Sequence, residues 1–301
     1  KIQTYTADTM TIDIDHKEFK IDDNKSLWNN RSLYELYNEA HTPWEWHKPI
    51  FERSRELGMI PLSTPFDNSA VDLLESLDSE LYKIASFENT DLQLIKRVAL
   101  TGKPIIISTG MMSVSEMGET VETARNFGCK DIILLKCTSN YPASPENTDL
   151  LTIPHMKKMF GCQVGLSDHT MGVGASVASV ALGASIIEKH FTLNRSDGGV
   201  DSAFSLEPSE MKSLVIESKR AWQALGGIKY GASKSEKPSL QFRRSLYIVK
   251  DIKAGEEITL ENIRAIRPGY GLPTKHLNNL IGKTVNRDIA RGTAVNWDFI
   301  G

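Results

Sequence analysis

The sequence predicts an α/β protein built on a (β/α)8 TIM-type barrel, followed by a small β-rich C-terminal domain. From Lys1 to Phe191, short segments rich in β-forming residues alternate with longer helical patterns, as expected of βα units around a parallel sheet. The strand-like segments span 1–6, 59–64, 80–86, 104–109, 132–138, 163–168 and 185–191. After Gly231 the pattern changes to short β-like pieces between glycine turns, which indicates a separate module.

Local patterns support the individual elements. Residues 104–109 are almost continuously apolar up to a polar end, which is typical of a strand covered on both faces. Thr42 is predicted to cap a helix, with Pro43 at its first position and Glu45 completing a capping box. Residues 113–116 have the same spacing and predict a second capped helix.

Polar residues gather where the predicted strands stop. In a (β/α) barrel these strand ends form the active-site face, so the pattern predicts an enzyme. The residues are Ser63, Thr64, Ser86, Ser108, Thr109, Thr138, Ser139, Ser167, Asp168 and His169.

A closed barrel of this class has eight strands, but the sequence opens inside a strand-like segment at Lys1. We therefore expect the first βα unit to be absent from this sequence. Either the numbering begins inside a longer protein, or the chain is a truncated product whose open barrel edge would lower its stability.

Three regions are predicted: a barrel over 1–232, a linker over 233–240 and a β-rich domain over 241–301. The last region contains a near-repeat, DIKAG at 251–255 and DIARG at 288–292. The repeat predicts two similar turns in a compact β fold.

Composition narrows the class of ligand and the compartment. The net charge is -3, from 35 basic and 38 acidic residues spread without like-charge blocks, which argues against nucleic acid and membrane surfaces and favours a small molecule. Cys129, Cys137 and Cys162 form no C-x-x-C pattern, which favours a reducing cytoplasm. No apolar run approaches the length of about 18 residues that a membrane-spanning helix needs, so the sequence predicts no such helix.

Two histidines at the ends of the last two predicted strands are the strongest candidates for chemistry. Neighbouring strands lie about 4.8 Å apart, so His169 and His190 can bind one ion together. Alternation places Glu188 on the same face as His190 and turns Lys189 to the other. Two imidazoles beside a carboxylate leave positions for water and substrate, which suits Mn²⁺, with Mg²⁺ or Co²⁺ as alternatives. The competing interpretation is a histidine that merely hydrogen-bonds at a strand end.

Five short motifs occur in order: STPF at 63–66, YKIAS at 82–86, STGM at 108–111, GLSDHT at 165–170 and EKHFT at 188–192. The tail adds RRSL at 243–246 and RPGYG at 267–271. Together they resemble the sialic acid synthase family over essentially the whole chain. The tail is similar to that family's antifreeze-like (SAF, β-clip) domain.

Within the family, the resemblance is closest to the pseudaminic acid synthases. LYELY at 33–37, TPWEWH at 42–47 and KIASFE at 83–88 point that way, since N-acetylneuraminate synthases usually carry Gly where Phe87 stands. The resemblance implies a cytoplasmic, metal-dependent transferase. It would condense phosphoenolpyruvate with 2,4-diacetamido-2,4,6-trideoxy-altrose and release phosphate by C–O cleavage. The alternative is an N-acetylneuraminate or legionaminate synthase acting on another acylamino sugar.

The resemblance also implies roles for single residues. Lys1 and Lys83 would supply positive charge to phosphoenolpyruvate, and Glu188 would orient or deprotonate a metal-bound water. Hydroxyl contacts are expected from Thr64, Ser86, Ser108 and Ser167. The sugar is expected to contact Gln3, Tyr141 and Asp201, with Ser139 standing where the family often has Asn. In a domain-swapped homodimer, Arg267 would reach the acylamino group of a sugar bound to the partner.

Three other functions remain open from the residues. In a pyruvate-dependent aldolase, Lys83 would form a Schiff base, although the hydroxyls beside it favour phosphate. The absent first unit suggests a sugar-binding homologue with impaired catalysis. Ice binding by the tail rests on its fold alone, which is a poor guide to function.

Overall fold

The computed structural model describes residues 1–22 and 28–301 of the chain. These residues form two compact units, Lys1–Gly226 and Gly227–Gly301, and each unit has a hydrophobic core of its own. The predicted division into 1–232, 233–240 and 241–301 stays a prediction.

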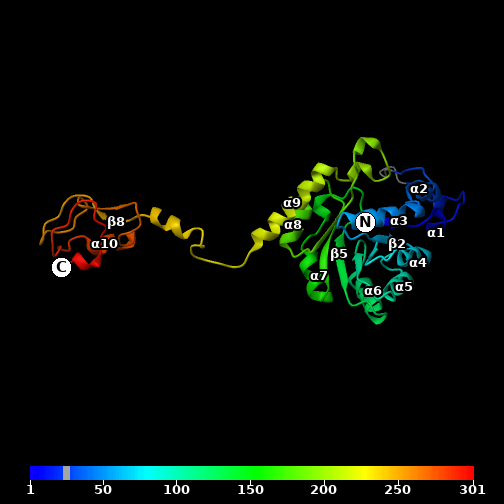
Figure 1. The fold of residues 1–301 in the computed structure, drawn as a ribbon, viewed down its shortest axis with the longest axis horizontal. Helices are drawn as coiled ribbons and strands as arrows, with labels where there is room; N and C mark the ends of the chain where they lie inside the picture. The colour runs from blue at the N-terminus through cyan, green and yellow to red at the C-terminus, as the bar shows by residue number, and fades with distance from the viewer. Residues whose placement is uncertain (23–27) are drawn as a thin grey trace. The chain divides into compact units, whose positions relative to one another are not determined.

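One sheet of seven parallel strands forms the centre of the first unit (Figure 1). The strands follow one another across the sheet in chain order. They are β1 (Ile2–Thr4), β2 (Ser63–Pro65), β3 (Tyr82–Ile84), β4 (Ile105–Ser108), β5 (Ile132–Cys137), β6 (Gln163–Asp168) and β7 (Ile186–Lys189). Each overlaps one of the predicted strand segments, so the barrel-type sheet is confirmed.

Helices follow the strands, and those within residues 44–160 pack apolar side chains against the outer face of the sheet (Figure 1). The helices of this unit are α1 (Ala7–Met10), α2 (Leu33–Ala40), α3 (Trp44–Glu56), α4 (Asn68–Ser76), α5 (Leu92–Ala99), α6 (Val114–Asn126), α7 (Thr152–Phe160), α8 (Gly174–Ala181) and α9 (Pro208–Leu225). Short 3-10 turns lie at η1 (Lys17–Phe19), η2 (Pro145–Asn147), η3 (Arg195–Asp197) and η4 (Ser202–Phe204). Among the described residues, no helix combines the length and apolar character needed to cross a membrane.

Side-chain alternation divides each strand between the core and the inner face of the sheet. Ile107, Leu134 and Val164 are paired neighbours on β4, β5 and β6, and all three are buried in the core under the helices. The next residue along each strand therefore points to the inner face. Because the strands are parallel, the inner-face side chains at their carboxyl ends meet at one edge of the sheet.

One of the two predicted helix caps is confirmed. Ser113 Oγ accepts a hydrogen bond from Glu116 N–H at 3.3 Å, and the Glu116 carboxylate accepts from Ser113 N–H at 2.7 Å. The predicted cap at Thr42 is wrong, because Pro43 keeps an extended ψ of 133° and α3 begins at the following residue. The Pro43 carbonyl accepts a hydrogen bond from Trp46 N–H at 3.0 Å, at the start of the helix.

The second unit contains a two-stranded antiparallel sheet, β8 (Ser245–Ile248) and β9 (Ile263–Ile266), and one short helix, α10 (Leu277–Leu280). The 3-10 turns are η5 (Lys237–Phe242), η6 (Thr274–His276) and η7 (Trp297–Phe299). Side chains from β8, β9 and the surrounding loops bury a small apolar core.

The near-repeat of the tail forms two equivalent turns, as predicted. The first residue of each segment accepts a hydrogen bond from the fourth residue of the other. Asp251 Oδ1 accepts from Arg291 N–H at 2.6 Å, and Asp288 Oδ1 accepts from Ala254 N–H at 2.9 Å. The glycine that ends each turn has a φ of +84° or +89°, a conformation that favours glycine.

We expect Gly165→Ala to destabilise the first unit. A Cβ at Gly165 on β6 would lie 2.3 Å from the carbonyl oxygen of Ile186 on β7 and 2.6 Å from Leu135, so the strands must shift. Overpacking of this kind typically lowers the free energy of unfolding by about 1–3 kcal/mol, which urea titration measures. Gly118→Ala on α6 is the matched control, because its Cβ meets nothing within 4 Å and alanine favours a helix. Equal losses in the two variants would contradict the prediction.

Candidate active site

A row of three side chains crosses the inner face of the sheet near the strand ends. Cys137 on β5 pairs in register with Ser167 on β6, and Ser167 pairs with Glu188 on β7. Ser167 Oγ donates a hydrogen bond to Glu188 Oε2 at 2.9 Å. His169 and His190 lie two residues beyond this row, so alternation returns both to the same face. The two predicted catalytic motifs therefore meet in one site.

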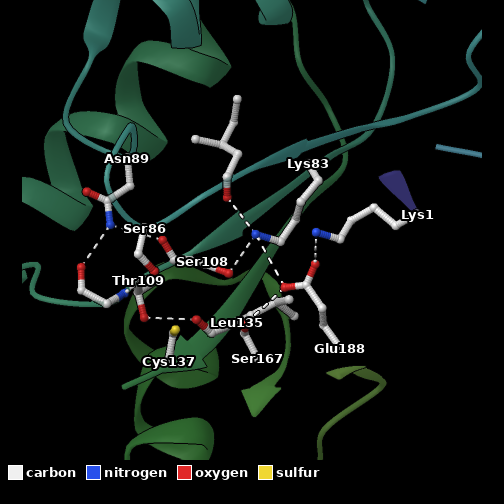
Figure 2. A network of polar contacts seen from close by, with 12 residues as sticks. Lys1, Lys83, Ser86, Asn89, Ser108, Thr109, Leu135, Cys137, Ser167 and Glu188 are labelled. Atoms are coloured by element: carbon white, nitrogen blue, oxygen red, sulfur yellow. Dashed lines mark hydrogen bonds and ion pairs between the residues drawn. The ribbon is translucent and has the colours of Figure 1, made fainter. Parts of the chain in front are cut away.

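Glu188 forms ion pairs with two lysines from distant strands (Figure 2). Lys1 Nζ lies 2.8 Å from Glu188 Oε1, and Lys83 Nζ lies 3.5 Å from Glu188 Oε2. Lys1 directly precedes β1, whereas Glu188 is on β7, so the first pair joins the two ends of the sheet. The sheet is curled enough that its first and last strands contribute to one site.

Burial and charge shift the pKa values of this cluster in opposite directions. Burial alone would raise the pKa of Glu188, but Lys83 and Lys1 hold it well below its ordinary value. Lys83 is only 2% exposed. Burial lowers its pKa, and the nearby Glu188 carboxylate opposes that shift. The site thus holds two cations around one carboxylate before any substrate arrives.

The Lys83 ammonium contacts a hydroxyl, a backbone carbonyl and a carboxylate, since it also donates to the Ile84 carbonyl at 2.7 Å. Lys83 Nζ donates to Ser108 Oγ at 2.6 Å, and Ser86 Oγ accepts from Gly110 N–H at 3.2 Å. A Cβ on Gly110 would lie 2.2 Å from Ser139 Oγ and 2.6 Å from Ser86 Oγ. Glycine at this position therefore lets the hydroxyls of Ser86 and Ser139 approach the loop after β4 closely.

Asn89, which the sequence reasoning missed, fixes the loop after β4 (Figure 2). Its Nδ2 donates to the carbonyl oxygens of Ser108 and Gly110, each at 3.0 Å. Its own carbonyl accepts from Thr120 Oγ1 on α6 at 2.7 Å. Asn89 is only 2% exposed, so this loop is held from within the protein. No pattern in the sequence marked it, because it lies in a turn outside the strand alternation.

The two histidine rings are held by their Nδ1 atoms. Their centroids are 5.3 Å apart. His169 Nδ1 lies 2.9 Å from the carbonyl oxygen of Thr138, and since a carbonyl only accepts, Nδ1 carries the proton. His190 Nδ1 lies 3.3 Å from Asp201 Oδ2. Both Nε2 atoms are therefore left for another ligand.

This donor set fits an open divalent metal site. Metal-binding histidines usually donate their other ring N–H to a backbone carbonyl or a carboxylate. His169 donates to the Thr138 carbonyl in this way, and the Asp201 carboxylate lies on the Nδ1 side of His190. Within 1–22 and 28–301, no group of three or more His, Cys, Asp or Glu side chains is placed to hold an ion. The protein would thus supply two imidazoles, and water or substrate oxygens would supply the remaining ligands.

Aromatic side chains form a wall beside the histidines. The Tyr141 ring lies 4.5 Å from the His169 ring and 5.5 Å from that of Phe204, which in turn lies 5.0 Å from the His190 ring. Trp28 lies 6.1 Å from Tyr141 and donates from Nε1 to the Val200 carbonyl. The wall gives the open side of the metal site an apolar border.

The remaining predicted residues lie in three different settings. Gln3 and Thr64 are paired neighbours on β1 and β2, and Thr64 Oγ1 is buried without a hydrogen-bond partner among the described residues. Asp201 contacts His190 rather than standing free. Arg267 is exposed on the second unit. Their contacts with substrate stay predictions.

Two further ionisable groups were missed as site residues. Burial raises the pKa of Glu88 to about 7, against the opposing charge of Lys83, and Glu88 Oε2 is buried without a partner in the described part of the chain. Burial would raise the pKa of the Cys137 thiol, but His169 lowers it to about 7. Glu88 ends the KIASFE motif at 83–88, but its position in a turn predicts no face for its side chain.

Comparison with known proteins identifies relatives along the whole chain. Residues 1–230 match the NeuB family, and residues 243–300 match the SAF domain. The chain is 42% identical over 295 residues to a pseudaminic acid synthase of Campylobacter jejuni subsp. jejuni, across 98% of this chain and 85% of the relative. It is 41% identical over 309 residues to a pseudaminic acid synthase of Helicobacter pylori, across 100% and 88%.

A solved structure shares the fold. The N-acetylneuraminic acid (sialic acid) synthetase from Leptospira borgpetersenii serovar Hardjo-bovis, crystallised with citrate, superposes with a TM-score of 0.65 at 32% identity. The match covers 70% of this chain and 74% of that one.

We expect Glu88→Gln to gain stability relative to wild type as the pH rises from 5 to 8. In the unfolded chain Glu88 ionises near the ordinary glutamate pKa of 4.5, whereas the folded group keeps its proton until about pH 7. The unfolded state therefore loses a proton first, and wild-type stability falls with rising pH. Glutamine removes that dependence, so the difference in unfolding free energy should shift by about 2–3 kcal/mol in urea titrations at the two pH values. Glu146→Gln at an exposed position is the control. A difference that does not change with pH would refute the assignment.

Proposed function

The chain belongs to the NeuB family, and we propose that it is a pseudaminic acid synthase, which condenses phosphoenolpyruvate with 2,4-diacetamido-2,4,6-trideoxy-altrose and releases phosphate. The observation that carries the proposal is the position of Lys1 and Lys83 beside the His169 and His190 pair on one face of the sheet. A cationic pocket for an anionic donor thus adjoins a metal site for a carbonyl acceptor.

Phosphoenolpyruvate would bind around the two lysines. Its phosphate and carboxylate need cations and hydroxyl or amide donors, because charge-assisted hydrogen bonds are the strong ones. Lys1 and Lys83 supply the charge, and the surrounding hydroxyls supply directional contacts. The hydroxyls are those of Thr64, Ser86, Ser108, Ser139 and Ser167. The unpaired Oγ1 of Thr64 supports this, since a buried polar atom without a partner is rare.

The acylamino sugar would lie between the histidines and the aromatic wall, with Gln3, Tyr141 and Asp201 at its sides. Arg267 would contact an acylamino group from the SAF domain of the partner in a homodimer. The support for these contacts is the family resemblance of the positions.

We assign the ion as Mn²⁺, held by His169 and His190, with Mg²⁺ or Co²⁺ as alternatives. When bound, it supplies Lewis-acid polarisation of the sugar carbonyl. The Thr138 carbonyl fixes the His169 tautomer that leaves Nε2 available, and the nearby Asp201 carboxylate favours the same tautomer of His190. The buried, unpaired cysteines agree with a reducing cytoplasm as the site of the reaction.

The protein groups then handle charge and protons. C3 of phosphoenolpyruvate attacks the sugar carbonyl carbon, water adds to the cationic C2, and the tetrahedral product loses phosphate by C–O cleavage. Lys1 and Lys83 offset the phosphate charge throughout. The sugar carbonyl oxygen gains a proton as it becomes a hydroxyl. Water gives up one proton when it adds to C2 and the other when the C2 carbonyl forms, and the departing phosphate gains one. Glu88, with a pKa of about 7, suits that exchange better than Glu188, which the lysines hold ionised.

One observation favours a second candidate, a pyruvate-dependent aldolase. Lys83 is buried and its pKa is lowered, as in Schiff-base lysines. Its contacts with Ser108 and Glu188 favour its use as a fixed cation instead.

We expect Mn²⁺-dependent phosphate release from phosphoenolpyruvate with the altrose derivative and little with N-acetylmannosamine. His169→Ala and His190→Ala should each lower the rate by about 100-fold or more, because each removes half of the protein's share of the metal site. A colorimetric phosphate assay at saturating sugar measures this.

Two controls separate the alternatives. Release only with N-acetylmannosamine would reassign the chain as an N-acetylneuraminate synthase. Covalent labelling of Lys83 by pyruvate and borohydride, read by mass spectrometry, would establish the aldolase. No release with either sugar from folded, metal-loaded protein would refute catalysis by this chain.

A further inference from the structure

A buried ion pair lies directly behind the two catalytic motifs. Asp168 Oδ2 on β6 and Lys189 Nζ on β7 are 2.8 Å apart, and their side chains are 0% and 1% exposed. Asp168 also accepts from Thr170 N–H at 2.8 Å and from Ser176 Oγ at 2.5 Å, while Lys189 donates to the Thr170 carbonyl. The pair is therefore fully desolvated and well supplied with hydrogen bonds.

The pair occupies the central position of each motif. Asp168 lies between Ser167 and His169, and Lys189 lies between Glu188 and His190. The flanking residues face the site, so Asp168 and Lys189 face the other side, as alternation predicts for Lys189. Asp168 and Lys189 are also register partners across β6 and β7. The same backbone segments thus carry the site on one face and the ion pair on the other.

Strand β7 is paired on one side only, and its other contacts lie in the site or beyond its end. Glu188 forms ion pairs with Lys1 and Lys83 in the site, and the residues after β7 hydrogen-bond to Leu206. Strand β7 is the last strand of the described sheet and pairs there with β6 alone. Its four residues are all intermediate in burial, whereas β4 is fully buried. A shift of one residue along β6 would turn Glu188 and His190 away from the site, because side chains alternate. An edge strand that carries two site residues needs a strong register constraint.

Stability alone does not account for the pair. The free-energy cost of removing two charges from water is about as large as the gain from their attraction. Well-packed apolar residues at the same positions often stabilise a protein equally well or better. Fixing a register is the best-supported use of a buried polar interaction. The hydrogen bond from Ser167 to Glu188 cannot fix the register alone, because it lies within the site and competes with ligands there.

We propose that Asp168 and Lys189 are positioning residues that fix the register of β7 on β6 and so hold the His169 and His190 imidazoles convergent for an ion. The part of this inference that concerns the ion rests on the proposed function. The part that concerns the strand register rests on the ion pair and its place in the sheet.

The test replaces both charges by apolar residues of similar size, Asp168→Leu with Lys189→Met, which leaves no unpaired buried charge. The matched control is Glu75→Leu with Lys103→Met, which removes a half-buried pair, 2.5 Å long, between α4 and the loop before β4. Three measurements apply: thermal unfolding, hydrogen exchange of residues 186–190 in the metal-free protein, and Mn²⁺ affinity by calorimetry.

We expect the double variant at β6 and β7 to melt near the wild-type temperature but to exchange the β7 amides at least about tenfold faster. Its Mn²⁺ affinity should fall by about 10–100-fold, the range for losing groups that orient metal ligands. The control variant should show neither change. A purely structural pair would move the melting temperature and leave β7 exchange and metal affinity unchanged in the folded protein.

A double variant that fails to fold is replaced by Asp168→Asn, which keeps the side-chain volume and an acceptor for Thr170 N–H while it removes the charge. Wild-type β7 protection and metal affinity in the folded double variant, or in this one, would overturn the proposal. Absence of Mn²⁺ binding by the wild type would instead refute the metal site of the proposed function. The exchange rates would still decide whether the pair fixes the strand.

Discussion

The ion pair between Lys1 and Glu188 sets the geometry on which the site depends. It joins a residue next to the first strand to a residue of the last strand, at 2.8 Å. A flat sheet of seven strands would separate these two side chains by roughly 29 Å, since neighbouring strands lie about 4.8 Å apart. Only a strongly curled sheet brings them together. The curvature therefore places Lys1, which precedes β1, and Lys83 of β3 on the same face as the histidines that follow β6 and β7.

The charge arrangement inside that curve suits an anionic ligand. Burial lowers the pKa of Lys83, and the Glu188 carboxylate opposes that shift and favours the charged form. A phosphate or carboxylate at the same place would favour the charged form further, because it would add negative charge where two ammonium groups already converge. The apolar wall at Tyr141 and Phe204 limits water on the other side and strengthens these interactions. Anion binding and carbonyl polarisation thus occupy adjacent parts of one curved surface.

The sequence predicted the sheet well, because buried parallel strands are short, apolar runs with polar ends. It also predicted which side chains of β6 and β7 share a face, since alternation is a local property of the strand. The wrong prediction of a cap at Thr42 also has a local cause. Proline is compatible both with the first helical position and with the N-cap position before it, and the spacing of the motif does not distinguish these two positions.

The residues that the sequence missed share one property, which is that tertiary contacts define them. Glu88 and Asn89 lie in the turn after β3, where no periodicity assigns a face. The raised pKa of Glu88 comes from burial, and the bonds of Asn89 reach a different loop. The contact of Asp201 with His190 likewise joins the loop after η3 to a strand end. Such contacts depend on the curvature of the whole sheet, which local sequence patterns do not predict.

The motifs at 167–169 and 188–190 show why neighbouring residues in a strand can serve different purposes. In each, the outer two residues face the site and the middle residue faces the helices. A site residue can therefore be constrained by its neighbour in sequence without any contact between their side chains. The middle residues are charged although their side chains are almost completely buried. Burial of a charge is costly unless the charge is paired. Opposite charges on two register partners therefore favour the one alignment of the strands that pairs them and disfavour registers shifted by a residue. Function on one face of β7 thus depends on electrostatics on the other.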